Sequence, residues 1–543
     1  MTGRSRLLLD LFLLAGFSAF LFFYGLAYFG LIGADEPRYA QIAREMLVRH
    51  DWITPTLGGM PWLEKPALYY WQAMLAYRVF GVSDWAARLP SAIDSTVMVF
   101  AVYLFLRRFR PGFELDGALM TASLAGVIGF ARAASMDMPL SAAFAIALLA
   151  WFGWYESGNK SYLALFYSCL AFGALAKGPV APFLAAAIIV VFALAIRKPS
   201  FIKRTLWLPG ITLFLAVTLP WYIAVQIRNP EFFSVFFLQH NLARFGTNLF
   251  HHTEPVWYFV PVLLLALIPW TMFVVAAAME EVRLWWKQKS PVPANQSLSI
   301  FLVIWMIVPV AFFSFSQSKL PGYILPALPA AALLIAEYLR SSIAAGARSD
   351  IFLSALHAII AALPIIPAMM LPFIIFQHRV PWGNWAEVSV TFAAVLAIGI
   401  TLTLRAKAGL RMLRLVTLVP VVLCVAAILR LGAPSLDVTL SARPLAEQIT
   451  KADSRRLPLA VLLISRETEY GLQFYRNQNI ARYELGQVAS GEHLVVAPEG
   501  LRKGVEKRAA GRRVTYLGSF AAQGLDYYWV GAGSNQLDSA DER

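Results

Sequence analysis

The stretch LIGADEPRYAQIAREM, residues 31–46, places two adjacent carboxylates and two arginines directly after an apolar run over residues 7–30. From Tyr39 to Leu47 its apolar and aromatic residues recur at the spacing of one helix face. Asp35 suits a helix N-cap, and Glu36 suits the positive end of a helix. The stretch therefore predicts an amphipathic helix that lies on a membrane surface, where the chain has just left the bilayer.

The composition is that of a polytopic membrane protein with mainly α structure. Of 543 residues, 59% are hydrophobic and 14% charged, whereas a soluble protein carries about a quarter charged residues. Arg4 and Arg6 precede the first apolar run, which we interpret as a retained signal-anchor helix. The expected spans are residues 7–30, 85–106, 115–133, 137–155, 161–178, 179–197, 206–226, 256–277, 298–316, 321–340, 352–376, 387–405 and 412–432.

The loops between these runs predict the orientation. Basic residues concentrate in residues 107–111, 197–204, 280–289 and 404–414, which the positive-inside rule assigns to the cytoplasm. The opposite loops and everything after residue 432 then face the other side, which in a bacterium is the periplasm. Because the basic residues occupy short loops, the net charge of +14 does not indicate a nucleic-acid partner.

Two parts of the outer face are expected to be ordered. The aromatic-rich stretch 65–81 predicts a second helix at the membrane interface. Residues 433–543 predict a small soluble α/β domain, with strands over 457–464, 493–498 and 512–520 and a helix over 466–477. The preceding residues 1–432 form the transmembrane domain, with its surface helices within residues 35–81.

Cations on the outer face are the second chemical signal, because the positive-inside rule disfavours them there. They are Lys65, Lys177, Arg244, Lys319, His251 and His252, with Arg38 beside the carboxylates. Each has a structural alternative, such as ion pairing or contact with lipid headgroups. Together with Asp35, Glu36, Glu64 and Asp137, they suggest a site that receives a phosphate and stabilises positive charge on a second group.

A metal or a nucleotide is not required by any of these motifs. GALAKGP, residues 173–179, lacks the spacing of a phosphate loop. His251 and His252 could hold a divalent metal with Glu64, although adjacent histidines point in different directions. We expect no obligatory cofactor. Cys169 and Cys424 lie in apolar runs and do not indicate a disulfide or a zinc site.

Four motifs in order, ADEPRYAQIAREM, HDWITPTLGG, WLEKPALYYW and SKLPGYILPALP, carry a family resemblance. Over about residues 7–340 the chain resembles the bacterial branch of the protein O-mannosyltransferase superfamily, which are type C (GT-C) glycosyltransferases of the membrane. Within that branch it is most similar to the lipid A 4-amino-4-deoxy-L-arabinose transferases. The resemblance implies a GT-C fold and transfer of a sugar from undecaprenyl phosphate to a lipid A phosphate in the periplasm. This modification gives resistance to polymyxin-type peptides.

The resemblance also implies roles for residues. Asp35 would be the catalytic carboxylate, supported by Glu36, and Asp137 the second acidic residue. Lys65 would bind the donor phosphate beside Glu64. Lys319 and Tyr323 fall where phosphate contacts are expected, and charge and predicted side add Arg38, Lys177 and Arg244. The enzyme is expected to act as a monomer.

Three questions stay open from the sequence. A phosphate acceptor is already ionised, so Asp35 would stabilise the donor sugar, whereas a hydroxyl acceptor would need Asp35 as a base. A related transferase that acts on protein or on another envelope glycan is the alternative within the class. A lipid transporter or flippase is the alternative outside it, although the ionisable residues lie at span ends rather than at the midplane.

Overall fold

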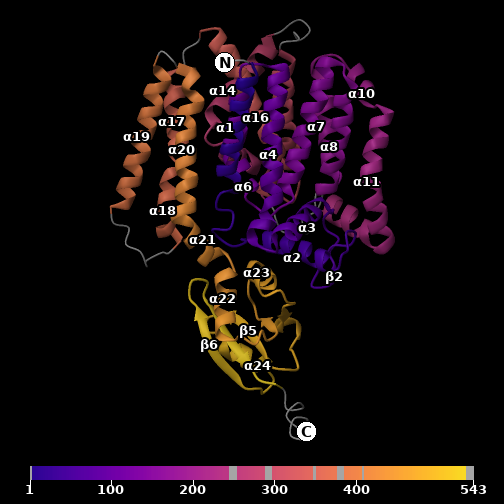
Figure 1. Ribbon diagram of the computed structural model, residues 1–543, viewed down its shortest axis with the longest axis vertical. Helices are drawn as coiled ribbons and strands as arrows, with labels where there is room; N and C mark the ends of the chain where they lie inside the picture. The colour runs from indigo at the N-terminus through magenta and orange to yellow at the C-terminus, as the bar shows by residue number, and fades with distance from the viewer. Residues whose placement is uncertain are drawn as a thin grey trace.

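The computed structural model describes residues 3–243, 254–287, 296–346, 350–375, 384–406 and 409–532. Long helices stand side by side in one bundle, and a small sheet lies beyond one end of it (Figure 1). The bundle helices are α1 (Gly3–Ser18), α4 (Asp84–Phe109), α5 (Glu114–Ser123), α6 (Ala125–Ala131), α7 (Asp137–Ser157), α8 (Lys160–Lys177), α9 (Val180–Ala195), α11 (Leu208–Arg228), α13 (Phe259–Ala266), α14 (Thr271–Lys287), α15 (Ser297–Ser314), α16 (Leu328–Ala344), α17 (Ile351–Ala362), α18 (Ile365–Ile375), α19 (Trp385–Arg405) and α20 (Leu413–Ala427).

The helices confirm an integral membrane protein. In the described part of the chain, nine helices are long and apolar enough to cross a membrane, and two further helix pairs qualify as bent spans. The nine match nine of the expected spans. Helices α8 and α9 occupy the positions of two more expected spans, 161–178 and 179–197.

Two expected spans, 115–133 and 256–277, are broken rather than continuous. The pair α5 and α6 bends by 64°, and the pair that ends in α14 bends by 117°. The second break contains Pro269, which has no N–H group and disfavours helix in the residue before it. At the first break Leu124 is extended, with ψ of 129°.

The two breaks lie against each other, which explains how they are tolerated. The Ala125 N–H donates to the Ile268 carbonyl at 2.8 Å, and Trp270 Nε1 donates to Ser123 Oγ at 2.9 Å. Backbone groups freed inside a membrane must find partners within the protein. Residues at each break therefore satisfy hydrogen-bonding groups at the other break.

The two expected surface helices are confirmed. They are α2 (Asp35–Val48) and α3 (Leu68–Phe80), with a short hairpin between them formed by β1 (Thr56–Leu57) and β2 (Met60–Pro61). Both lie across the end of the bundle that faces the sheet (Figure 1). Buried residues of the two helices, including Tyr39, Ile42, Tyr69 and Tyr70, form one apolar cluster.

The C-terminal sheet has five strands in the order β4-β3-β5-β7-β6. Strands β3 (Leu459–Val461), β4 (Ala481–Arg482) and β5 (His493–Pro498) are parallel, whereas β6 (Val514–Phe520) and β7 (Leu525–Val530) pair antiparallel. The accompanying helices are α21 (Ala433–Leu440), α22 (Arg443–Ala452), α23 (Arg466–Arg476) and α24 (Arg502–Arg508). The three expected strands and the helix over 466–477 are present, and β4, β7, α22 and α24 were not expected.

The sheet is attached to the bundle through Asp84, the first residue of α4. Arg443 Nη1 contacts Asp84 Oδ2 at 2.8 Å, and the Tyr475 hydroxyl donates to Asp84 Oδ1 at 2.8 Å. The same Tyr475 oxygen accepts from the Leu31 N–H at 2.7 Å. These contacts place the C-terminal segment directly beside the start of α2.

Candidate active site

Asp35 and Glu36 begin helix α2 and point into different environments. The Asp35 side chain is 56% exposed, and that of Glu36 is 8% exposed. Asp35 does not cap the helix as expected, because the helix begins at Asp35 itself and Ala34 is the N-cap. Glu36 instead ties the preceding loop to the helix, since its Oε2 accepts from the Ile32 N–H at 2.8 Å.

Glu36 is the centre of a buried ion pair. Arg88 donates to it from Nε at 2.9 Å and from Nη2 at 2.6 Å, and the Ala134 N–H donates at 2.7 Å. Arg88 also donates to the carbonyls of Leu26, Phe29 and Gly30. Glu36 therefore fixes α2 onto the membrane helices and holds its neighbour Asp35 in place.

Arg38 pairs with Asp35 and is enclosed by aromatic rings. Its Nη2 donates to Asp35 Oδ1, and its guanidinium lies 5.1 Å from the ring centres of Tyr39 and Trp62 and 5.7 Å from that of Tyr470. Burial lowers the pKa of Arg38, but Tyr39, Asp35 and Glu64 outweigh it, so that the pKa is raised. Arg38 thus connects the Asp35 carboxylate electrostatically to Glu64.

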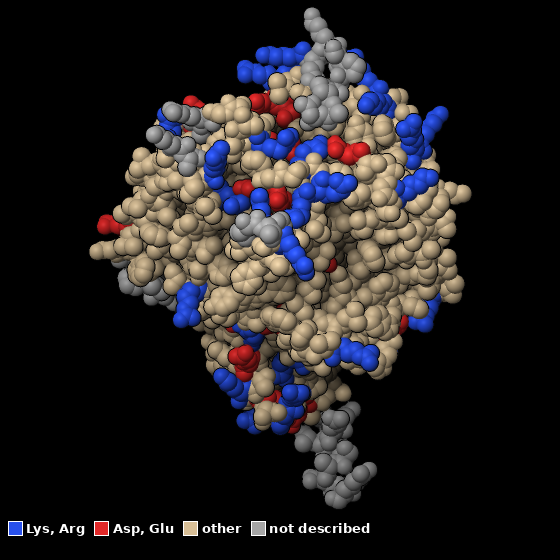
Figure 2. Space-filling view, turned by 45° about the horizontal axis from the view of Figure 1, so that its top comes forward, with Lys and Arg blue, Asp and Glu red and all other residues tan. Residues whose placement is uncertain are grey.

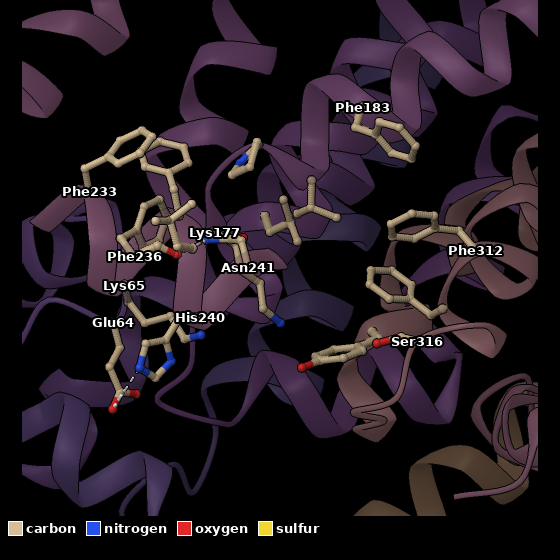
Figure 3. Close-up of a pocket in the computed structure, with 17 residues that line it drawn as sticks. Glu64, Lys65, Lys177, Phe183, Phe233, Phe236, His240, Asn241, Phe312 and Ser316 are labelled. Carbon is tan, nitrogen blue, oxygen red and sulfur yellow. Dashed lines mark hydrogen bonds and ion pairs between the residues drawn. The ribbon is translucent and has the colours of Figure 1, made fainter. Parts of the chain in front are cut away.

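A cavity of about 530 Å³ lies between the loop that precedes α3, the ends of α7, α8, α9 and α15, and the segment Phe233–Ala243. Its polar lining comprises Glu64, Lys65, Lys177, His240, Asn241, Ser316 and Tyr323. Its apolar lining includes Phe183, Phe233, Phe236, Phe237, Phe312 and Phe313. Figure 3 shows Glu64, Lys65 and His240 at one side of this cavity and Phe183 and Phe312 at the other. The cavity thus combines cations with a long aromatic wall.

Lys177 brings Asp137 and Tyr323 together. It is the last residue of α8 and its Nζ donates to Oδ1 of Asp137, the first residue of α7. The same ammonium lies 4.6 Å from the centre of the Tyr323 ring. Gly322 makes this approach possible, because a Cβ there would meet Asp137 Cγ at 2.9 Å.

Other residues predicted for the site do not line the cavity or lie outside the described residues. Lys319 is buried, donates to the Ser316 carbonyl at 2.6 Å and does not line the cavity. Arg244, His251 and His252 lie outside the described residues. Asp35, Arg38 and Asp137 are not part of the cavity lining, although Asp137 reaches it through Lys177.

His240 is a lining residue that the sequence interpretation missed. Its Nε2 lies 3.7 Å from Glu64 Oε1, as the dashed line in Figure 3 marks. It belongs to the helical segment Phe233–Ala243, where the run QHN interrupts an apolar sequence and offered the available signal. No group of three metal-binding side chains occurs among the residues that the structure describes.

Comparison with known proteins extends this picture. Residues 64–223 match the family of dolichyl-phosphate-mannose-protein mannosyltransferases. An undecaprenyl phosphate-alpha-4-amino-4-deoxy-L-arabinose arabinosyl transferase of Pseudomonas fluorescens Pf-5 is 32% identical over 330 residues, which are 59% of this chain and 58% of that protein. Its counterpart in Pseudomonas aeruginosa UCBPP-PA14 is 31% identical over 57% of this chain and 56% of that protein. These matches span less than two thirds of each relative's length.

A solved structure is similar over nearly the whole chain. The crystal structure of ArnT from Cupriavidus metallidurans bound to undecaprenyl phosphate has a TM-score of 0.74 and 21% sequence identity, and the match covers 96% of this chain and 97% of that one. The apo form of the same protein matches with a TM-score of 0.74 as well. The resemblance indicated by the four motifs is confirmed, and the chain has the GT-C fold of these membrane transferases.

Proposed function

We propose that the protein is a glycosyltransferase that moves 4-amino-4-deoxy-L-arabinose from undecaprenyl phosphate to a phosphate of lipid A. The observation that carries this proposal is the cavity in which Lys65 and Lys177 adjoin an aromatic wall. A polyprenyl phosphate has the same two parts, an anionic headgroup and a long apolar chain. The names of the relatives and the ligand of the solved structure support the same donor.

The donor phosphate is bound by Lys65, with Lys177 supporting it from α8. A lysine ammonium binds phosphate oxygens through charge-assisted hydrogen bonds. Lys177 sits at the C-terminal end of α8, where a cation is favoured by the helix dipole. Asp137 and Tyr323 hold its ammonium in position. The isoprenoid chain lies along the phenylalanines of the cavity.

The transfer breaks the bond between the anomeric carbon and the phosphate oxygen, and the electron pair leaves with undecaprenyl phosphate. An oxygen of the acceptor phosphate forms the new bond to that carbon. Lysines that face the leaving phosphate stabilise its developing charge. Asp35 stabilises the positive charge on the sugar, because an ionised phosphate acceptor has no proton to lose.

The reaction takes place at the periplasmic face of the inner membrane, on a monomer. Basic loops at one end of the bundle and the surface helices at the other support this orientation. Attaching an aminosugar to lipid A masks a negative charge, which reduces binding of cationic peptides such as polymyxins.

Mass spectrometry of lipid A tests the proposal. The wild type, Asp35→Asn and Lys65→Met would be expressed in a transferase-deficient Gram-negative strain, with the surface variant Glu506→Gln as the control. We expect aminoarabinose on lipid A with the wild type and Glu506→Gln, and loss of it with the other two at equal protein levels. A well-expressed wild type that leaves lipid A unmodified would contradict the proposed sugar and acceptor.

We also propose that the transfer needs no added cofactor, since the chain's own cations face the phosphate. Purified protein would be treated with a chelator and assayed with the donor and lipid A. Full activity after chelation is the expected result. Loss of activity that returns with a divalent metal would instead show that the transfer needs a metal.

A further inference from the structure

A second cavity, of about 560 Å³, lies at the end of the bundle away from the sheet. Its lining residues are Phe109, Arg110, Tyr155, Glu156, Lys198, Phe201, Ser297 and Arg340. They come from the ends of α4, α7 and α16, the start of α15, and residues 198–201 at the start of α10 (Ser200–Thr205). Lysine and arginine side chains gather on this face of the molecule (Figure 2). The cavity is far along the bundle from the donor site and shares no lining residue with it.

Two of the three cations in this cavity are already paired with acids. Arg110 binds Glu156 through both oxygens, at 2.8 and 3.1 Å, and Arg340 Nη2 lies 2.8 Å from Glu337 Oε2. Arg110 Nε also lies 3.7 Å from Glu337, which links the two pairs. Two arginines and two glutamates therefore balance, and these charges cancel.

Lys198 is the third cation that lines this cavity. Within the described residues, its side chain forms no ion pair. Lys198 is thus a cation at this cavity that no ion pair offsets within the described residues, which favours an anionic ligand. The phosphate diester of a phospholipid is such a ligand.

The backbone holds Lys198 at the cavity in a defined turn. At the end of α9 the Lys198 N–H donates to the Ala193 carbonyl at 2.9 Å, and the Arg197 N–H donates to the Leu194 carbonyl at 3.0 Å. This is the Schellman pattern, in which the residue before the last donor is left-handed. Arg197 occupies that position with φ of 57°, although glycine is the favoured residue there. Arg197 therefore holds a strained left-handed conformation in the turn that places Lys198 at the cavity.

Aromatic rings form the apolar side of the cavity. Phe109, Tyr155 and Phe201 are all partly buried, and the Tyr155 and Phe201 rings lie 4.8 Å apart. Phe109 is the last residue of the candidate span α4, and Tyr155 lies near the end of the candidate span α7. The ends of membrane spans are expected at the depth where lipid headgroups meet their acyl chains.

We propose that this cavity binds the headgroup of an anionic phospholipid, with a phosphate diester such as that of phosphatidylglycerol. Lys198 binds the phosphate, Arg340 lies beside it, and the glycerol backbone contacts the aromatic rings. Basic cavities between membrane helices on the positively charged side suit such headgroups. The bound lipid links α4, α7, α15 and α16 at their ends.

Lipid retention on the full-length protein tests this site without any assay of transfer. The wild type, Lys198→Glu and Lys198→Met would be placed in nanodiscs of phosphatidylglycerol and phosphatidylethanolamine, released, and examined by native mass spectrometry. Lys203→Glu is the matched control, because Lys203 lies on the same face in α10 and does not line the cavity. We expect one retained phosphatidylglycerol on the wild type and on Lys203→Glu, and at least about a tenfold loss in both Lys198 variants, the factor that corresponds to one lost charge-assisted contact.

Three results would overturn the proposal. The first is that the wild type retains phosphatidylethanolamine as readily as phosphatidylglycerol. The second is that the Lys198 variants retain as much lipid as Lys203→Glu. The third is that inorganic phosphate raises the thermal unfolding midpoint as much as phosphatidylglycerol does. The last result would assign the cavity to a free anion rather than to a lipid. Each comparison is made on folded protein, since Lys198 is exposed and its replacement removes no core contact.

Discussion

Asp35 and Glu36 show how two neighbouring carboxylates in one turn of helix acquire different tasks. The exposed Asp35 carboxylate accepts a hydrogen bond from the Arg38 side chain, whereas Glu36 accepts four hydrogen bonds in a buried site. Removing one partner of a buried ion pair leaves an uncompensated charge. The two residues are adjacent in the sequence, and their different burial gives them different roles.

Replacing Arg88 with Met is therefore expected to destabilise the protein strongly. The buried Glu36 carboxylate would lose both guanidinium hydrogen bonds, at a cost of about 3–5 kcal/mol. The thermal unfolding midpoint in detergent and the yield of monodisperse protein measure this loss. Asp35→Asn is the control and should unfold at the wild-type temperature, and equal stability of the two variants would contradict the assigned roles.

Gly322 allows a second residue-scale prediction. A Cβ at this position would meet Asp137 Cγ and the Phe130 ring at 2.9 Å each, so Gly322→Ala must displace one of them. We expect weaker donor binding, seen as a raised KM for the undecaprenyl donor, because Asp137 positions Lys177. Gly399→Ala, in open space on α19, is the matched control. Wild-type kinetics for Gly322→Ala would contradict the expectation that the new methyl group displaces Asp137 rather than the Phe130 ring.

At the scale of elements, the surface helices were predictable and the broken spans were not. Helix α2 has an amphipathic repeat after an apolar run, and that pattern leaves little choice of structure. Residues 117–131 contain no charged residue and no proline, so their composition does not locate the break at Leu124. That break depends on the Ile268 carbonyl, which is distant in sequence. Similarly, the sequence could nominate Lys65 and Lys177, but it could not show that His240 adjoins Glu64.

Helix α23 of the C-terminal segment contacts α2 and is expected to affect turnover. Its Tyr470 ring covers the guanidinium of Arg38, and Arg44 of α2 donates to the Phe474 carbonyl at 2.6 Å. Tyr470→Leu removes a cation–π contact of about 0.5–2 kcal/mol, one of the three ring contacts that hold Arg38 beside Asp35. We expect kcat to fall several-fold while binding of undecaprenyl phosphate stays unchanged.

Tyr470→Phe keeps the ring and serves as the control for this variant. Its activity should remain near that of the wild type. If the Leu and Phe variants lose activity equally, the hydroxyl rather than the ring is important. If neither loses activity, α23 has only a structural role at the surface of α2.

At the scale of the whole molecule, the C-terminal sheet was predictable in type and only partly in extent. Its core strands β3 and β5 are short runs of buried residues, which the sequence marks clearly. Strand β4 has two residues, which are too few to show an alternation of apolar and polar side chains. The boundary at residue 433 remains a prediction, since α21 and α22 continue directly from the last membrane helix to the sheet.

The buried His493 allows a prediction of how the stability of the sheet depends on pH. It is buried at the start of β5, between the Tyr483 hydroxyl on Nε2 and the Gly491 carbonyl 2.7 Å from Nδ1. Burial lowers the pKa of His493 from its ordinary 6.5, outweighing the contact with Gly491. As the pH falls through 6.5 the unfolded chain takes up a proton first, so stability is lost from that point downward.

Hydrogen exchange of β5 in the full-length protein measures this effect. Wild type and His493→Gln would be compared at the same pH, so that intrinsic exchange rates cancel. Protection of the wild type relative to the variant should decrease as the pH falls below 6.5. A ratio that stays constant with pH would show that His493 does not set the acid stability of the sheet.

The contact between Tyr470 and Arg38 also has a consequence for the timing of synthesis. A ribosome makes Asp35 and Arg38 long before Tyr470, because most of the membrane helices lie between them in the sequence. The surface helix therefore lacks part of its surroundings while the bundle is being inserted into the membrane. A nascent or truncated chain that lacks Tyr470 would hold an unfinished site, and the proposed transfer would begin only after this part of the C-terminal segment has been made and folded.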